Sequence, residues 1–373
     1  MGAPEKPPTL VLVQAFRSID TLRAATPEFA VETASARKIL IVEVAGLGDL
    51  VHSVPAMAAV RQTYPNAELH CLVRREYASL LGLAPWIDRV WSYRRNRRSL
   101  SLGSVVSTTR ALRAEGFDIA IDLMGSDHAS TAAWLSGAKR RLVRRPGPIR
   151  TRFAWRWFGT DLIESPFGQE PMYLQRWRSL QQAGIRSATP TFELLPGPSL
   201  VSLLGAEAAT AQYVHLSPFT KRSSKELPPA QLVELLLRLR EERGELRLAI
   251  SCSGQGREQR ALDALLRALP FAPWRVFAGT LDIPQLHALI EGAALHLGGD
   301  TASMHLAWLA GTPSVCWMSA LASHRTWAPE GERHAMVYSD VPPGEHLLGI
   351  ATEAVVARSL ELLRASAGSG GRS

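Results

Sequence analysis

A short apolar run that ends in a glycine pair constrains the fold of this chain more than any other stretch. Residues 293–297 predict a buried strand, and Gly298 and Gly299 end it. Asp300 and Thr301 then open a segment that predicts a helix, and a further apolar run follows the helix. A strand–turn–helix–strand order of this kind is typical of α/β proteins with parallel sheets.

The glycine pair and the helix start together predict an anion site. Glycine lets a ligand approach the backbone closely, and the free N–H groups at a helix start favour phosphate. The alternative interpretation is an ordinary turn in which Asp300 or Thr301 only caps the helix. The pattern alone leaves both interpretations open.

A second strand–turn–helix unit lies near the start of the chain. Residues 38–44 predict a strand, Gly46, Gly48 and Asp49 form the turn, and residues 50–64 predict a helix. Asp49 is therefore expected where a parallel strand ends, facing the crevice of an open α/β sheet. A carboxylate there can accept a proton from an attacking hydroxyl, or it can cap the helix without any substrate.

Strands and helices alternate through both halves of the chain, which predicts parallel sheets with right-handed crossovers. Residues 195–211, which begin with prolines and a glycine, predict a linker between the halves. The other expected strands are 68–73, 90–93, 117–123, 213–216, 246–251, 275–277 and 314–318, and the other expected helices are 77–83, 102–115, 130–136, 229–243, 258–269, 283–291 and 347–365.

The composition indicates two domains and an acidic partner. With 373 residues, 46% of them hydrophobic, the chain can fill two cores, and none of its apolar runs approaches the ~20 residues of a membrane span. The three cysteines are far apart in apolar runs, which predicts buried thiols and a reducing compartment. The net charge of +8 favours nucleic acid, an anionic membrane face or a phosphorylated substrate.

The two turn motifs together resemble glycosyltransferase family 9, the bacterial heptosyltransferases. The early motif, Gly-Leu-Gly-Asp followed by Pro-Ala-Met, is similar to the family's Leu-Gly-Asp and Pro-Ala-Leu, with Met57 in place of the last leucine. The late motif, Asp-Thr-Ala-Ser-Met-His-Leu-Ala, is similar to Asp-[Thr/Ser]-Gly-x-x-His-x-Ala, with Ala302 in place of the glycine. The order and separation of the motifs also fit, and the resemblance covers residues 38–345.

This resemblance implies a GT-B fold, in which two Rossmann-like domains face each other across a cleft. It also implies inverting transfer of heptose from ADP-heptose to the lipopolysaccharide inner core, without a cofactor. The expected parts are an extension at 1–37, an acceptor domain at 38–200, a nucleotide-sugar domain at 201–345, and a last helix and tail at 346–373 that pack back on the first domain.

The resemblance assigns the catalytic base to Asp49, beside Gly48. It assigns the nucleotide sugar to the late motif, where Gly299, Asp300, Thr301, Ala302, Ser303 and His305 are the expected contacts. Judged from the residues alone, His305 is more simply a histidine of the core.

A polar loop after residue 216 supplies further candidates. The family has Lys-x-Trp-Pro at the end of this loop, whereas this chain has Lys225 and Pro228 with Leu227 in place of the tryptophan. Lys225 or Lys221 can neutralise donor phosphates, with the hydroxyls of Ser217 and Thr220 nearby. The alternative is a solvated loop before a helix.

Residues 139–156 contain eight basic residues and no acidic one, with aromatic residues interleaved. Arginine favours contact with phosphate and carboxylate, so Arg140, Arg141 and Arg144 are expected to bind an anionic glycolipid acceptor at the inner-membrane surface. A solvated charged face is the commoner meaning of such a run. A second basic run lies at 94–98.

Two other functions stay open from the sequence. A nucleic-acid-binding protein would use the basic and aromatic region for single strands, but the common nucleic-acid motifs are absent, so we expect no nucleic-acid partner. A transferase with another nucleotide sugar, or with a protein or metabolite acceptor, would keep the fold. The absence of an Asp-x-Asp sequence predicts a metal-independent reaction, and the expected location is cytoplasmic, with peripheral contact at the inner membrane.

Overall fold

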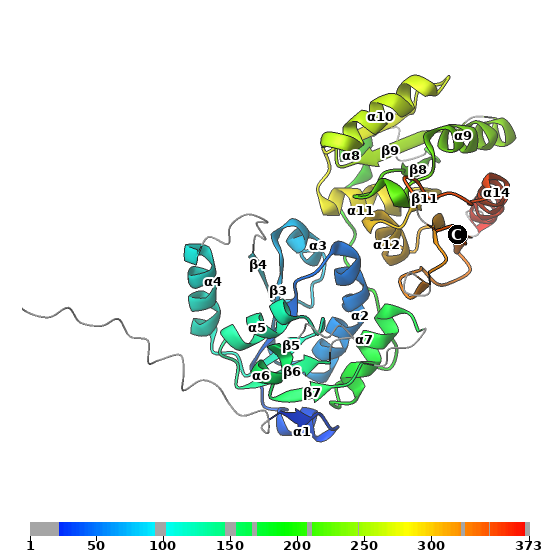
Figure 1. Ribbon diagram of the computed structural model, residues 1–373. Helices are drawn as coiled ribbons and strands as arrows, with labels where there is room; N and C mark the ends of the chain where they lie inside the picture. The colour runs from blue at the N-terminus through cyan, green and yellow to red at the C-terminus, as the bar shows by residue number, and fades with distance from the viewer. Residues whose placement is uncertain are drawn as a thin grey trace, which may run out of the picture.

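The computed structural model of the chain contains two α/β domains, drawn below and above in Figure 1. It describes residues 22–93, 102–145, 154–165, 170–206, 211–244, 246–321, 325–342 and 344–369. Each domain is built on one sheet, and all the strand pairs in both sheets are parallel. The predicted α/β class with parallel sheets is confirmed.

The first sheet has the strand order β1-β7-β6-β5-β2-β3-β4. Its strands are β1 (Arg23–Ala24), β2 (Lys38–Glu43), β3 (Glu68–Arg74), β4 (Arg89–Tyr93), β5 (Ile119–Asp122), β6 (Arg140–Arg144) and β7 (Asp161–Ile163). Its helices are α1 (Glu28–Glu32), α2 (Leu47–Thr63), α3 (Ala78–Leu81), α4 (Leu102–Glu115), α5 (Asp127–Leu135), α6 (Ala154–Phe158) and α7 (Met172–Gln181).

Strand β2 lies inside the first sheet and is covered on both faces. Ile39 and Ile41 join the apolar cluster that contains α2, whereas Leu40 and Val42 join the cluster that contains α5. The run Ile-Leu-Ile-Val is therefore apolar at every position, as a parallel sheet between two helical layers requires.

The second sheet has the order β10-β9-β8-β11-β12-β13. Its strands are β8 (Val214–Ser217), β9 (Leu248–Cys252), β10 (Arg275–Ala278), β11 (Leu295–Gly299), β12 (Ser314–Ser319) and β13 (His334–Ser339). Its helices are α8 (Leu200–Leu204), α9 (Pro229–Arg243), α10 (Gly256–Ala268), α11 (Ile283–Glu291), α12 (Ala302–Leu309) and α14 (Thr352–Ser369).

Helices α2 and α12 pack against each other where the domains meet. Leu306 and Leu309 of α12 belong to the same apolar cluster as Leu47 and Val51 of α2. Because these two helices also carry the early and late motifs, this contact brings the two motifs together.

The last helix lies on the second domain, so the expectation that it packs back on the first domain is wrong. Helix α14 contacts α9 and the strands β11, β12 and β13. Val355 and Leu363 of α14 are buried in the cluster that contains Leu232 and Leu235 of α9. In Figure 1 the helix runs beside α9 and far from the first sheet.

The first sheet also begins before the expected boundary at residue 37. Arg23 and Ala24 pair with Asp161 and Leu162 of β7, and Phe29 of α1 is buried in the first core. Residues 22–37 are therefore part of this domain. Within the described residues, no helix is both long and apolar enough to cross a membrane.

Candidate active site

A cavity of about 930 Å³ opens at the edge where the strands of both sheets end. Its walls are formed by the residues that follow β2 and β3 of the first domain, and β8, β9, β10 and β11 of the second. Ligands of open α/β sheets bind at this carboxyl edge. Of the predicted site residues, it is lined by Gly48, Asp49, Ser217, Thr220, Lys221, Lys225, Asp300, Thr301, Ala302, Ser303 and His305.

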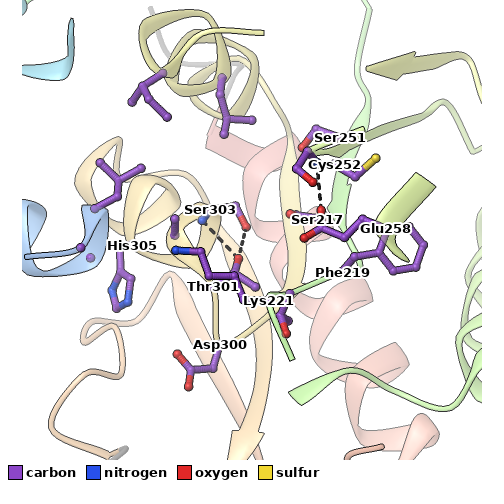
Figure 2. A pocket seen from close by; sticks show the side chains of 18 of the residues that line it. Ser217, Phe219, Lys221, Ser251, Cys252, Glu258, Asp300, Thr301, Ser303 and His305 are labelled. Carbon is purple, nitrogen blue, oxygen red and sulfur yellow. Dashed lines mark hydrogen bonds between the residues drawn. The ribbon is translucent and has the colours of Figure 1, made fainter. Parts of the chain in front are cut away.

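The start of α12 forms one wall of the cavity (Figure 2). Thr301 is the N-cap of the helix, and its hydroxyl oxygen accepts a hydrogen bond from the Ser303 amide at 3.2 Å. The two hydroxyls of Thr301 and Ser303 lie 2.6 Å apart. The capping interpretation is confirmed. Because the helix start still faces the cavity, the anion site stays a prediction.

Lys225 forms an ion pair with Asp300, whose carboxylate is 2.5 Å from the lysine ammonium. About a third of the Lys225 side chain is exposed. Lys221 also lines the cavity, and no ion pair joins it to an acidic residue in the described part of the chain. Both lysines that the sequence suggested for phosphate binding therefore line the same cavity. They differ because Lys225 is paired with a carboxylate and Lys221 has no such partner among the described residues.

Gly299 and Thr220 serve the protein framework more than the cavity. A Cβ atom on Gly299 would lie 3.0 Å from the Lys225 carbonyl oxygen and 3.1 Å from the Trp317 indole nitrogen, and Gly299 does not line the cavity. The Thr220 hydroxyl donates to the Arg222 carbonyl at 2.6 Å. The glycine leaves room for the Lys225 carbonyl and for the Trp317 indole of β12, and the threonine hydroxyl is used within its own loop.

The far end of the cavity was not identified from the sequence. It is lined by the apolar side chains of Phe219, Phe277 and Leu281 and by the carboxylate of Glu258, with Phe219 and Glu258 opposite His305 in Figure 2. The Ser253 amide donates to Glu258 Oε2 at 2.9 Å, which fixes that carboxylate. An apolar slot with one carboxylate suits a base and the hydroxyls of its sugar.

Asp49 reaches the cavity from the first domain. Helix α2 begins at Leu47, three residues earlier than expected, so Asp49 lies in its first turn. Asp49 Oδ2 accepts a hydrogen bond from the Gly46 amide at 3.1 Å, and the side chain is 25% exposed. The N-cap position is therefore Gly46 and not Asp49. The Asp49 carboxylate still satisfies an amide at the helix start, and it also lines the cavity.

Arg176 of α7 binds Asp49 and was missed by the sequence analysis. Its Nη2 donates to Asp49 Oδ1 at 2.8 Å and its Nη1 to Ser53 Oγ at 2.6 Å, and Nη1 also donates to the Asp49 carbonyl. The side chain is 2% exposed. No expected helix covered residues 172–181, so nothing in the pattern placed an arginine beside Asp49.

Glu43 is a second buried carboxylate beside Arg176. Its Oε2 accepts from Ser53 Oγ at 2.5 Å and lies 3.5 Å from Arg176 Nη1. Burial raises the pKa of Glu43 from 4.5 to about 7, against the opposing pull of the Arg176 charge, and the nearby Asp49 raises it further. Arg176 is thus held between two carboxylates, of which only Asp49 faces the cavity.

His305 of the second domain contacts the first domain at two places, His52 and Gly48. His305 Nδ1 lies 3.1 Å from Nε2 of His52, which belongs to α2. His305 is 6% exposed, and burial lowers its pKa to about 4. A Cβ atom on Gly48 would lie 2.5 Å from His305 Cδ2, so the second glycine of the early motif is required by the histidine of the late motif. His305 is a core histidine that also lines the cavity.

In the described part of the basic run, residues 139–145 and 154–156, Arg140 and Arg141 are engaged within the first domain. Residues 140–144 are strand β6, whose Leu142 and Val143 are fully buried. Arg140 lies at the amino end of that strand, away from the cavity, and forms two hydrogen bonds with Asp161 at 2.8 and 2.9 Å. Arg141 donates to the backbone carbonyls of residues 158 and 138.

The expectation that Arg140 and Arg141 bind the acceptor therefore does not fit the structure, because their donors are used inside the domain. Arg144 lies at the carboxyl end of β6, is 4% exposed and donates to Ser165. Burial lowers its pKa to about 9. The runs at 94–98 and 146–153 lie outside the described residues.

Comparison with known proteins decides the family. The model of glycosyltransferase family 9 (heptosyltransferase) matches residues 105–345. The chain belongs to glycosyltransferase family 9. The matched region includes Lys225, Asp300 and His305, whereas Asp49 lies outside it.

Relatives in this family are similar over most of the chain. Lipopolysaccharide heptosyltransferase 3 of Escherichia coli strain K12 is 22% identical over 288 residues, which cover 76% of this chain and 82% of that protein. Among solved structures, a family 9 glycosyltransferase from Veillonella parvula has a TM-score of 0.74 at 15% identity, and covers 88% of this chain and 97% of that one. The Escherichia coli ADP-heptose lps heptosyltransferase II has a TM-score of 0.70 at 17% identity, with 88% and 99% covered.

These likenesses establish the GT-B fold and the glycosyltransferase class of this family 9 protein. Among the residues that the structure describes, His, Cys, Asp and Glu side chains form no group of three or more suited to a metal ion. Metal independence stays a prediction.

Proposed function

We propose that this glycosyltransferase transfers heptose from ADP-heptose to an anionic acceptor of the lipopolysaccharide core, with inversion at the anomeric carbon. The observation that carries the proposal is the shared cavity, in which the Asp49 carboxylate of one domain faces the Lys225 ammonium and the α12 start of the other. A base and an anion site on opposite walls are the two parts that such a displacement needs.

We propose that the donor binds to the second domain. Its base and ribose would lie in the slot near Phe277 and Glu258, and its diphosphate against the start of α12, with Lys221 and Lys225 alongside. Negative charge develops on the diphosphate as the sugar departs, and these fixed positive groups lower the barrier by stabilising that charge. The choice of ADP rests on relatives: one Escherichia coli heptosyltransferase was solved with ADP-2-deoxy-2-fluoro heptose.

Asp49 is the proposed general base. The acceptor hydroxyl oxygen forms a bond to the anomeric carbon, its proton passes to Asp49, and the bond to ADP breaks with its electron pair leaving on the diphosphate. Attack opposite to the leaving group inverts the configuration. Arg176 holds Asp49 Oδ1, so the carboxylate is fixed before the acceptor arrives, which reduces the cost of orienting it.

The acceptor is proposed from the names of relatives, which are lipopolysaccharide heptosyltransferases. An acidic acceptor agrees with the net charge of +8. A cytoplasmic location, contact with the inner-membrane surface and the absence of a nucleic-acid partner stay predictions.

A transfer assay tests the proposal. Purified protein is incubated in EDTA with ADP-heptose and a deacylated core acceptor, and the linkage of the product is determined by NMR. We expect ADP release in step with one new glycosidic bond of inverted configuration. Transfer from a UDP- or GDP-sugar alone would overturn the donor, and a product of retained configuration would overturn the single-step role of Asp49.

A further inference from the structure

The polar loop that carries Lys221 and Lys225 is closed by an ion pair between the buried carboxylate of Glu226 and the partly exposed guanidinium of Arg257. Glu226, at the end of the loop, is 4% exposed, and its Oε1 accepts a hydrogen bond from the Thr220 amide at 2.6 Å. Arg257 of α10 donates to both oxygens of the same carboxylate, at 2.7 and 2.6 Å. It also donates to the Thr220 carbonyl. The two ends of the loop are thereby joined through one guanidinium.

Both lysines lie within the segment that this contact closes. Lys225 directly precedes Glu226, and Lys221 directly follows Thr220. A bidentate contact between arginine and a buried carboxylate is strong and directional. A loop held in its binding geometry loses less conformational entropy when a ligand binds. The pair therefore fixes the backbone that carries two cationic side chains, and neither Glu226 nor Arg257 lines the cavity itself.

Next to Glu226, Leu227 occupies the place of the tryptophan in the family's Lys-x-Trp-Pro. It is buried in the same apolar cluster as Leu232 of α9, so the loop is anchored to the core at the position that follows the ion pair.

We propose that Arg257 is a positioning residue that, through Glu226, sets the phosphate-binding geometry of residues 220–225. The proposal rests on the donor site described above. Arg257 does not line the cavity. Its effect is therefore confined to the diphosphate, the part of the donor that the two lysines would contact. Glu258, its neighbour on α10, is fixed separately by the Ser253 amide, so the nucleoside end keeps its geometry when Arg257 is changed.

The test compares ADP with adenosine by calorimetric titration of the full chain. In Arg257→Met we expect about tenfold weaker binding of ADP, the order of effect of one charge contact, with adenosine affinity unchanged. Glu226→Gln is also expected to weaken the binding of ADP and to leave adenosine affinity unchanged. Arg260→Met is the matched control, since Arg260 lies on the same helix, is exposed and does not line the cavity.

Two results would overturn the proposal and differ from failure of the donor site itself. If wild type binds ADP and Arg257→Met binds it equally well, the positioning role is wrong while the donor site stands. An equal loss of ADP and adenosine would make Arg257 a general structural residue. Absence of ADP binding by folded wild type would remove the donor site and this proposal with it.

If Arg257→Met does not fold, Arg257→Lys is the substitute variant. It keeps a positive charge beside Glu226 but cannot make the bidentate contact, and a loss of affinity confined to ADP is expected there too.

Discussion

The carboxyl edges of the two sheets carry charge in opposite ways. In the first domain, Glu43, Asp122, Arg144 and Arg176 are each at most 4% exposed and are bonded to one another or to neighbouring hydroxyl and amide groups. In the second domain, the charge beside the cavity comprises half-exposed or exposed lysines and a helix start, together with the carboxylates of Asp300 and Glu258. The first edge is built around one fixed carboxylate, and the second around groups that can meet an incoming anion.

The two edges therefore suit different parts of the proposed reaction. A buried network holds Asp49 in a single orientation, as proton transfer requires. Lys225 is partly exposed and paired with Asp300. We expect such an accessible ammonium to be able to exchange its carboxylate partner for a phosphate of the donor. The predictions below test whether the chemical step belongs to the first edge and donor binding to the second.

The largest effect is expected from Asp49→Asn. Removal of a general base lowers turnover by about 10²–10⁴-fold, and the amide retains the shape of the side chain. Steady-state transfer with a deacylated acceptor measures the loss. If the variant kept a third of wild-type turnover, Asp49 would not be the general base, and the chemical step could not be assigned to the first domain.

Arg176→Met is expected to reduce both stability and turnover. Above pH 7, where Glu43 is ionised, it leaves this buried carboxylate without its cation, and breaking one side of such a pair costs about 3–5 kcal/mol. Chemical denaturation of the variant measures this loss. The double variant Arg176→Met/Glu43→Gln should regain stability but not turnover, because Asp49 still lacks its hydrogen-bond donor. Recovery of both would mean that Arg176 only balances charge.

Glu43 makes the stability of the first domain depend on pH. Its pKa rises from 4.5 in the unfolded chain to about 7 in the fold, so the folded protein binds this proton more tightly. That contribution is complete below pH 4.5 and is lost as pH rises through 7, by at most about 3 kcal/mol. Glu43→Gln should flatten the fall in stability between pH 5 and pH 8.

Thermal unfolding across that pH range measures the slope. Asp122→Asn is the control, because burial raises the pKa of Asp122 from 3.8 only to about 6, so its effect ends at lower pH. An unchanged slope in Glu43→Gln would show that the buried network does not hold Glu43 protonated.

The smallest effect on activity is expected from Arg140→Met. Arg140 pairs with Asp161, which is 3% exposed, so we expect a stability loss of about 1–3 kcal/mol and unchanged kinetics. A large rise in the KM for the acceptor would show that Arg140 contributes to acceptor binding. The described contrast between the carboxyl edges of the two sheets would then be incomplete.

The sequence predicted the parts whose signals are local. The helices 102–115, 229–243 and 283–291 have their expected bounds, and the turns around Asp49 and Asp300 line one cavity as expected. Strand β6 was missed because its apolar core is two residues long and flanked by arginines, of which Arg140 pairs with Asp161 on another strand.

Arg176 was missed for a similar reason. It meets Asp49 from 127 positions along the chain, and no short motif encodes such a contact. The placement of α14 failed because an amphipathic helix does not state which domain covers its apolar face; here Leu232 and Leu235 do.

The most direct test of the divided site is calorimetric binding of ADP to wild type, Asp49→Asn and Lys225→Met, in EDTA, with UDP and GDP as comparisons. We predict preference for ADP, affinity within about twofold of wild type in Asp49→Asn, and about tenfold weaker binding in Lys225→Met. Equal loss in both variants, or a loss only in Asp49→Asn, would contradict the assignment of donor binding to the second domain.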